Sequence, residues 1–196
     1  FEKIIVNMEK FWIWISMSLD IFCKLYEPWK KAGKIIYEND HAYAILSVTP
    51  ATPGHAIVIS KSHVETLDEL RGESLEGFVD AIPATLSAIQ DLYQTNPAAL
   101  VEFYQNLRDN PPVPVSAKKA KKMLRHKHLL ASPDWSHNVG YNVGEYAGQM
   151  VNHLHAQLFP RRERGPGIVT AMEDFFSPEI KAQAKKLLHT IAQYFR

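Results

Sequence analysis

The chain has 196 residues, of which 46% are hydrophobic, so it is long enough to bury one sizeable core. Its formal net charge is only +1 at pH 7, which excludes a general electrostatic attraction to nucleic acid or membranes and leaves only local ones. The single cysteine, Cys23, excludes an internal disulfide and is typical of a reducing compartment, so we expect a cytoplasmic location. We predict one domain over residues 1–196.

The amino end contains the most apolar run of the chain, nine residues from Phe11 to Leu19. A helix that crosses a bilayer needs about 20 apolar residues, so this run is too short to span a membrane. No small-residue cleavage site follows it, which argues against a secretory signal. We therefore expect residues 1–19 to form a helical extension that packs on protein, and we expect no membrane partner.

Three β-rich segments follow, at Lys34 to Tyr37, Ala42 to Val48 and His55 to Ser60. The polar residues 38–41 indicate a hairpin between the first two, and the prolines and glycine in 49–54 indicate a turn before the third. Apolar residues recur at helical spacing from Glu65 to Tyr93. Gly72 separates a short helix from a long one, and Pro83 predicts either a kink or a late start of the long helix.

Residues 97–135 form a basic segment that we predict to be a helical insertion. From Asn106 to Asp134 the chain has seven Lys and Arg residues against two Asp residues. The prolines in 111–114 indicate a stiff extended stretch, and 116–129 is predicted to be a helix capped by Ser116. Two interpretations remain open. The segment is either a solvated insertion or an arm that supplies cations to a polyphosphate chain or to RNA.

The strongest chemical signal is the run from His153 to Arg161. If Val151 to Phe159 is a strand, its side chains alternate between the two faces of the sheet. One face then carries His153, His155 and Gln157, and the other carries Leu154, Ala156 and Leu158. A neutral imidazole can attack phosphorus, and a second imidazole and an amide beside it can donate hydrogen bonds to the phosphate oxygens.

A glycine occurs at every fourth position just upstream, at Gly140, Gly144 and Gly148. One interpretation is a hairpin loop whose glycines supply positive φ angles. The other is a loop whose backbone N–H groups approach a phosphate, with Asn142 and Gln149 as additional polar contacts. A P-loop is excluded, because no Gly-Lys-Ser/Thr sequence follows.

The motifs Gly-Tyr-Asn-Val-Gly, Ala-Gly-Gln and His-Leu-His-Ala-Gln-Leu-Phe-Pro-Arg resemble those of the histidine triad (HIT) superfamily of nucleotide hydrolases and transferases. The usual motif has His at all three alternate positions. Gln157 at the third resembles the galactose-1-phosphate uridylyltransferase and diadenosine tetraphosphate phosphorylase branches. The segment from Asp20 to Leu25 is similar to the opening of small family members. The resemblance implies a HIT-like α+β fold, with a mainly antiparallel sheet of about five strands and flanking helices, and a homodimer.

The resemblance also implies a catalytic mechanism. His155 would attack the α-phosphorus of a nucleotide conjugate or dinucleoside polyphosphate, and the nucleotidyl-histidine formed would pass to water. His153 would orient or assist it, and His55, from the Pro-Gly-His strand, would support the triad. Gln157 and the backbone of Gly148 would hold the phosphate oxygens.

Further residues would bind the nucleotide by the same resemblance. Asn142 would brace the glycine loop, which also contains Gln149. The residues that match the wall of the nucleobase pocket are Ile21, Phe22, Ile45 and Val48. Ser47 stands where the family usually has an Asp that binds the ribose, and Met150 stands where it usually has Ser or Thr, so a sugar contact and a phosphate contact differ here.

The expected reaction requires no cofactor. Some family members bind zinc, and the residues that match their ligands are Asp20, Cys23, His55 and His153. Because a carboxylate here replaces one thiolate, we do not assign a metal site. Two other functions remain open: a nucleotidyltransferase or phosphorylase with the same intermediate, and a non-catalytic module that binds nucleotides or RNA. Hydrolysis is our first expectation, because the chain lacks the second domain and the paired cysteines of the large uridylyltransferases.

Overall fold

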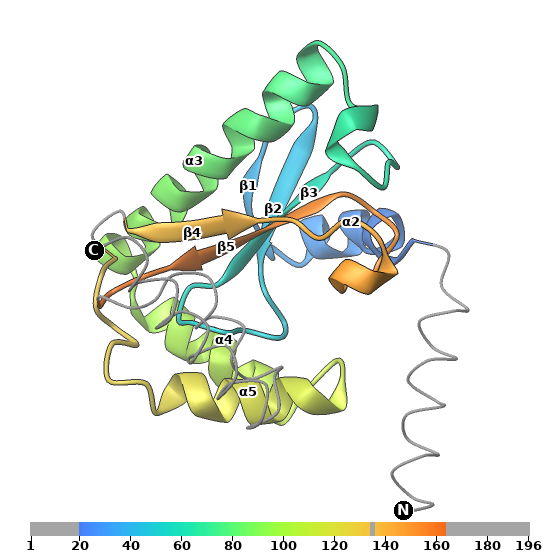
Figure 1. The fold of residues 1–196 in the computed structure, drawn as a ribbon. Coiled ribbons are helices and arrows are strands. Elements are labelled where there is room, and N and C mark those ends of the chain that lie inside the picture. Colours follow the sequence, from blue (N-terminus) through green and yellow to red (C-terminus); the bar gives the residue numbers. More distant parts are fainter. Residues whose placement is uncertain (1–19, 134–135, 164–196) are drawn as a thin grey trace, which may run out of the picture.

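The fold is built on one open sheet, seen in the computed structural model, which describes residues 20–133 and 136–163 (Figure 1). Its strands are β1 (Ile35–Glu38), β2 (Ala42–Leu46), β3 (Ala56–Ser60), β4 (His137–Gly140) and β5 (His155–Pro160). The five strands have the order β1-β2-β3-β5-β4, and every neighbouring pair is antiparallel. The expected α+β fold with a mainly antiparallel sheet is therefore confirmed. The predicted helical extension, residues 1–19, lies outside the described residues.

Helices flank this sheet. They are α2 (Ile21–Lys31), α3 (Glu73–Thr95), α4 (Ala98–Asp109) and α5 (Pro114–Leu124), with short 3-10 helices η1 (Leu67–Glu69) and η2 (Glu145–Ala147). Helix α3 packs on β1, β2, β3 and β5, and α4 packs on α5 (Figure 1). Gly72 separates η1 from α3, as the sequence predicts, and α3 begins at Glu73, well before Pro83, so the helix does not start late at this proline. No helix in the described part of the chain is both long and apolar enough to cross a bilayer.

The two faces of the sheet bury different sets of side chains, because successive residues of a strand point to opposite sides. The face toward α3 carries Ala44, Leu46, Val58, Ala156 and Leu158, which belong to the main core. The opposite face carries Tyr43, Ile45, Ile57 and Ile59, which pack with Phe22 of α2 in a second apolar cluster. His155 and Gln157 alternate with the main-core residues of β5 and therefore lie on the α2 face.

The helices α4 and α5 of the basic insertion are part of the main core. They and the following turn contribute Leu100, Tyr104, Leu107, Ala120, Met123 and Leu129. Burying one large apolar side chain stabilises a protein by roughly 1.5–3 kcal/mol, so the interpretation as a merely solvated insertion is wrong. Helix α5 begins at Pro114, a residue favoured at the first helical position, with Val113 as its N-cap. Ser116 is buried inside the helix, so it is not the predicted cap.

The strand predicted from Val151 begins only at His155. The chain turns just before it, where the His153 N–H donates to the Val151 carbonyl at 2.8 Å and the Leu154 N–H donates to the Val64 carbonyl at 2.6 Å. His153 therefore precedes the strand and does not share the face of His155 by simple alternation. The edge strand β4, which the sequence did not indicate, pairs with β5 and places Gly140 opposite Gln157.

Candidate active site

His155 is held in one tautomer by the backbone. Its Nδ1 lies 2.7 Å from the carbonyl oxygen of His153, and a carbonyl can only accept. Nδ1 therefore carries the proton and donates it, so Nε2 keeps a free lone pair. Burial lowers the pKa of His155, and although the bond to the His153 carbonyl opposes that effect, the imidazole is neutral at pH 7. The structure thus presents a neutral imidazole whose unprotonated nitrogen points away from the backbone.

His55 determines which way the amide of Gln157 points. The Ala51 N–H donates to His55 Nδ1 at 3.2 Å, so this nitrogen is an acceptor. Burial lowers the pKa of His55 to about 4, so the ring is neutral and its one proton is on Nε2. Nε2 lies 2.7 Å from Gln157 Oε1 and donates to it. The Gln157 NH₂ group consequently remains to donate to a ligand.

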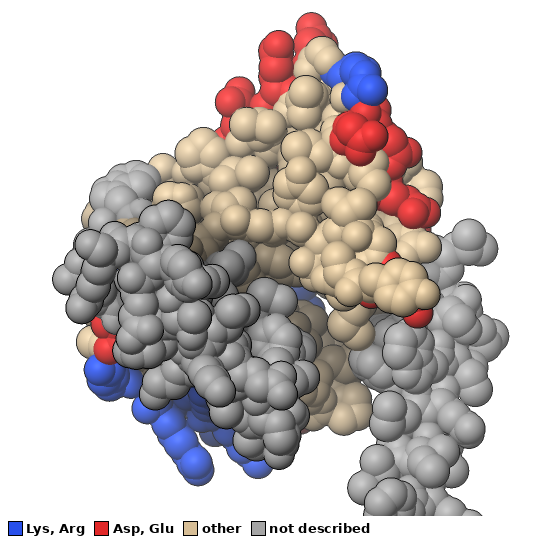
Figure 2. Space-filling model, in the orientation of Figure 1, with Lys and Arg blue, Asp and Glu red and all other residues tan. Residues whose placement is uncertain are grey.

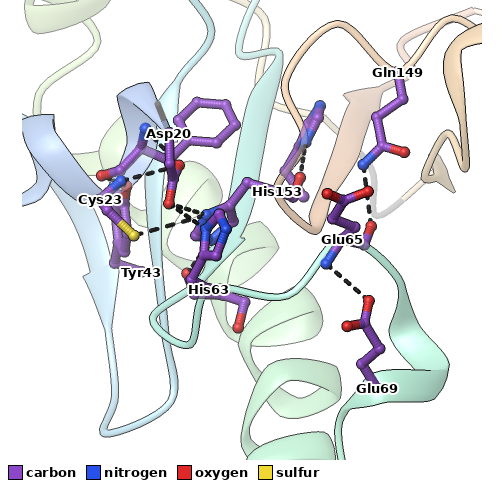
Figure 3. A network of polar contacts seen from close by, with 11 residues as sticks. Asp20, Cys23, Tyr43, His63, Glu65, Glu69, Gln149 and His153 are labelled. Carbon is purple, nitrogen blue, oxygen red and sulfur yellow. Dashed lines mark hydrogen bonds and ion pairs between the residues drawn. The ribbon is translucent and has the colours of Figure 1, made fainter. Parts of the chain in front are cut away.

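His153 is buried between two acceptors (Figure 3). Its Nδ1 lies 2.8 Å from Asp20 Oδ2, and its Nε2 lies 2.7 Å from the Ser60 carbonyl oxygen. Although burial raises the pKa of Asp20, hydrogen bonds with Cys23, His153 and His63 lower it to about 2, so Asp20 is ionised. His153 is therefore fixed between an ionised carboxylate and a backbone carbonyl.

The same corner offers a set of metal-binding atoms. Ligand atoms of Asp20, Cys23, His63 and His153 all lie within 4.8 Å of one another. His55, which the resemblance matches to a zinc ligand of the family, hydrogen-bonds Gln157 instead. His63 takes that place, with its Nδ1 2.6 Å from Asp20 Oδ2. No pattern in the sequence distinguished His63, which follows β3 in an ordinary polar turn.

The donor set of this corner fits Zn²⁺ by type, since imidazole, thiolate and carboxylate all bind it. Two features oppose it. Burial and the neighbouring carboxylate of Asp20 raise the pKa of Cys23 to about 11, so the sulfur is a protonated thiol. The two histidine nitrogens lie 2.6 and 2.8 Å from Asp20 Oδ2. Ligand atoms around a tetrahedral zinc are about 3.3 Å apart, given metal–ligand bonds of about 2.0–2.1 Å. Zinc would therefore have to displace the proton of the Cys23 thiol and move the two histidine nitrogens away from Asp20 Oδ2.

The glycine loop is braced from within. Asn142 Nδ2 donates to the Gly148 carbonyl at 3.1 Å, which matches the bracing role expected for Asn142. The Gly148 N–H donates to the Glu145 carbonyl at 2.9 Å, so it is already used inside the loop. Gln149 is buried, accepts from the Gly144 N–H at 2.7 Å and donates to the Glu65 carbonyl at 3.0 Å. The structure thus gives Gln149 a bracing role, whereas the sequence analysis placed it among the ligand contacts.

The expected base pocket is only partly assembled from the predicted residues. Phe22 and Ile45 lie in the apolar cluster under α2, and Ile21 packs against it. The Phe22 ring lies 5.2 Å from that of His155, centroid to centroid. Val48 packs instead against the main core on the other face, and Ser47 is buried with its hydroxyl accepting from the Thr49 N–H at 3.2 Å. The aromatic residues Trp29 and Tyr43 line the cluster and were not predicted.

Comparisons with known proteins identify the family of this chain. Residues 30–164 match the family model described as HIT domain. An uncharacterised HIT-like protein of Methanocaldococcus jannaschii is 25% identical, over 85% of this chain and 97% of that protein. The adenosine 5′-monophosphoramidase of Saccharomyces cerevisiae is 26% identical, over 76% of this chain and 66% of that one. A crystal structure of a HIT family member from Bacillus subtilis is 23% identical, with a TM-score of 0.46, over 90% of this chain and 96% of that one. Because the family model covers more than half of its length, the chain belongs to the HIT domain family.

Proposed function

We propose that this protein is a nucleotide hydrolase that acts at the α-phosphate through a covalent intermediate on His155. The observation that carries the proposal is the bond between His155 Nδ1 and the His153 carbonyl, which leaves Nε2 unprotonated and neutral at pH 7. A nitrogen in that state is a nucleophile without further activation. The name of the yeast relative, adenosine 5′-monophosphoramidase, supports a substrate in which an adenylyl group is bonded to a leaving group.

The proposed reaction has two displacements. In the first, His155 Nε2 forms a bond to the α-phosphorus while the bond from phosphorus to the leaving group breaks, and the leaving group departs with that electron pair. In the second, water attacks the same phosphorus, the bond to Nε2 breaks, and the nucleoside monophosphate departs. The NH₂ group of Gln157 would donate to a phosphoryl oxygen, where the negative charge is held in both transition states.

His153 and Asp20 would support this reaction without contacting the phosphate. The carbonyl that fixes the tautomer of His155 belongs to His153, whose ring is held by Asp20 and by the Ser60 carbonyl. The base of the nucleotide would pack near Phe22, whose ring contacts both His153 and His155. These residues would thus act by fixing the position of His155 Nε2.

The decisive test is His155→Ala. We expect hydrolysis of an adenosine phosphoramidate to fall by on the order of 10³-fold or more, because the nucleophile is lost. Binding of AMP should stay within about tenfold, since the apolar cluster and Gln157 remain. The exposed His137 on β4 provides a matched control, and His137→Ala should keep full activity. Mass spectrometry of the quenched wild-type protein should show a nucleotidyl adduct on His155; retention of more than a few per cent of activity in His155→Ala would refute the role of this residue.

One observation favours a transferase as the second candidate. The only proton of the His55 ring is donated to Gln157, and neither residue is charged at pH 7. This pair therefore has no ready proton for a departing group, which favours good leaving groups and a longer-lived intermediate. Reaction with added inorganic phosphate or a sugar phosphate would reveal transfer as a second nucleotidyl product. Only water-derived products at high acceptor concentration would exclude it.

A homodimer remains a proposal, and the exposed apolar residues of β4 and the following loop support it. They are Val139, Tyr141, Val143, Tyr146 and Met150. Strand β4 is the last strand of the sheet, so its outer backbone groups lack a strand partner among the described residues. An apolar edge of this kind is typical of a surface that pairs with another chain. Light scattering of wild type and Val139→Lys would compare the masses in solution.

The basic face of α5 supports a role for the insertion in binding polyanions, which also remains a proposal. Figure 2 shows Lys and Arg side chains at the lower edge of the molecule, where α5 lies in Figure 1, and acidic side chains at the opposite end. Lys118, Lys121, Lys122 and Arg125 line one surface groove there. Their spacing of three or four residues puts them on one side of the helix. A dinucleoside polyphosphate or RNA is the ligand that this face would attract.

A further inference from the structure

The turn before β3 is held by a helix of the insertion. The Gly54 N–H donates to the Tyr104 hydroxyl oxygen at 2.8 Å, and Tyr104, on α4, is completely buried. Gly54 has a φ of +77°, and an added Cβ would lie only 3.3 Å from atoms of Ile89 and Tyr93. Only glycine fits this conformation and this space without strain. The turn is therefore fixed against α3 and α4 at the residue next to His55.

Arg162 holds the same turn from the end of β5. Its Nη1 donates to the Pro53 carbonyl at 2.8 Å, and its Nε donates to the Ala131 carbonyl at 2.5 Å. The guanidinium also lies over the ring of Tyr93, 4.6 Å from the centroid. Burial lowers the pKa of Arg162, but a guanidinium keeps its charge at neutral pH. Arg162 thus joins the turn to the segment that follows α5.

This turn contains the donor that sets the tautomer of His55. The Ala51 backbone N–H donates to His55 Nδ1, and the backbone N–H of His55 donates to the Thr52 carbonyl at 3.0 Å. If the Ala51 N–H moved away, the proton of His55 could occupy either nitrogen. With the proton on Nδ1, Nε2 would become an acceptor, and the amide of Gln157 would turn to donate to it. The oxygen of Gln157 would then face the phosphate and repel it.

We infer that Tyr104 and Arg162 are positioning residues for the reaction, acting through the turn 51–54 and His55 on the orientation of the Gln157 amide. The inference rests on the proposed function in one respect, the contact of this amide with phosphate. It gives the helical insertion a role in the active site that its basic surface does not explain. A glutamine cannot use charge to orient itself, so its direction depends on the fixed tautomer of its partner.

The tautomer of His55 can be measured without any substrate. Nitrogen-15 NMR distinguishes a protonated from an unprotonated ring nitrogen, and wild type should show the proton on Nε2. Tyr104→Phe removes only the hydroxyl that accepts from Gly54, and Arg162→Met removes the donor to Pro53; each should give a mixture of the two tautomers. Arg162→Lys, which keeps one donor, should restore most of the wild-type signal.

Kinetics with an adenosine phosphoramidate provide the second measurement. Each of Tyr104→Phe and Arg162→Met should lower kcat about fivefold or more, the effect of one lost neutral hydrogen bond, with KM within about twofold. Thr85→Val is the matched control, because Thr85 is buried on α3 and donates to the Ala81 carbonyl far from the turn in sequence. In a Gln157→Met background Tyr104→Phe should cost nothing further, because no amide remains to be oriented.

The outcomes separate the two hypotheses. A single Nε2–H tautomer in folded Tyr104→Phe and Arg162→Met would overturn the positioning role, whatever the activity. A loss of kcat that is equally large in the Gln157→Met background, or in Thr85→Val, would assign the effect to general packing and would also overturn it. A mixed tautomer in both variants would support positioning even if wild type hydrolysed no nucleotide, in which case only the proposed function would fail.

Discussion

Gln157→Glu tests the assigned direction of the Gln157 amide, because the substitution changes almost no volume. One carboxylate oxygen would still accept from His55 Nε2, as Gln157 Oε1 does at 2.7 Å. The other oxygen would replace the NH₂ group that we propose to donate to the phosphate. The variant therefore exchanges a donor for a negative charge at a single position and keeps the rest of the site.

Two costs compete in this variant at pH 7. If the new carboxylate keeps its charge, the phosphate loses a hydrogen bond, which costs about 1.5–3 kcal/mol for a charged group. The carboxylate also repels the phosphate by about 4 kcal/mol, for unit charges about 4 Å apart at an effective dielectric constant of about 20. Protonating a glutamate of ordinary pKa, about 4.3, instead costs about 3.7 kcal/mol at pH 7. Protonation is the smaller cost, so the variant should react with its new carboxyl group protonated. At about 1.4 kcal/mol for each factor of ten, a cost of about 3.7 kcal/mol lowers kcat/KM roughly 500-fold.

The pH dependence makes this prediction specific. The protonation cost falls with pH, so the ratio of Gln157→Glu to wild-type kcat/KM should rise up to about tenfold for each unit of pH from 7 down to about 5. Gln157→Met loses the donor without gaining charge; we expect a drop of about 10- to 100-fold with no change of this ratio with pH. Steady-state hydrolysis of an adenosine phosphoramidate gives both ratios. Near wild-type activity of Gln157→Glu at pH 7, or a ratio independent of pH, would show that the amide does not donate to the phosphate.

Three further predictions follow from other parts of the structure. Burial lowers the pKa of His55 from 6.5 to about 4, so as the pH falls the unfolded chain binds this proton at a higher pH than the native state does. The free energy of unfolding should therefore fall by about 3 kcal/mol between pH 6.5 and 4. Urea unfolding at a series of pH values should show this fall, and His55→Gln should reduce it. Asp20→Cys exchanges a carboxylate for a thiolate in the set with Cys23, His63 and His153. A competition assay with a zinc-binding dye should show that the variant binds zinc at least about tenfold more tightly than wild type. Equal zinc affinities of the two proteins would refute a site there. The double variant Lys118→Glu, Lys121→Glu should bind single-stranded RNA or a long dinucleoside polyphosphate more weakly than wild type. This difference in affinity should shrink as the salt concentration rises from about 50 to 200 mM. If the affinities of wild type and the variant depend on salt in the same way, the basic face does not have that role.

The sequence predicted strands β1 to β3 and the side assignment of β5 well, because both follow from local patterns, whereas the five-stranded antiparallel sheet was implied only by the family resemblance. The alternation from Leu154 to Leu158 correctly assigned apolar residues to the core and His155 to the opposite face. The same alternation extended the strand too far, since it includes His153. That residue is turned by bonds to Asp20 and Ser60, which are distant in the sequence. A period cannot reveal such partners.

The basic insertion was misjudged for a related reason. Its lysines dominate the composition, yet Ala120 and Met123 recur at a spacing of three residues and are completely buried. That spacing was the signal of a helix with one core face. The role of Tyr104 had no local signal, because its partner Gly54 is 50 residues away in the chain. Contacts of this kind depend on the packing of complete helices against a turn, which no short motif encodes.

The register of the sheet also determines when the active site can form. Leu46 pairs with Ala56 across a short turn, whereas Ala56 pairs with Leu158 on its other side. Closing a loop of about 100 residues costs about 2 kcal/mol more chain entropy than closing one of about 10, so the second pairing is favoured once the intervening helices have folded. On a ribosome, where the amino end emerges first, β1 to β3 and the helices are complete before His155 and Gln157 have been synthesised. Strand β5, which carries His155 and Gln157, is thus the last of the described strands to be synthesised, and β4, which pairs only with β5, joins the sheet with it. The proposed hydrolytic centre is therefore assembled only when nearly the whole described fold exists.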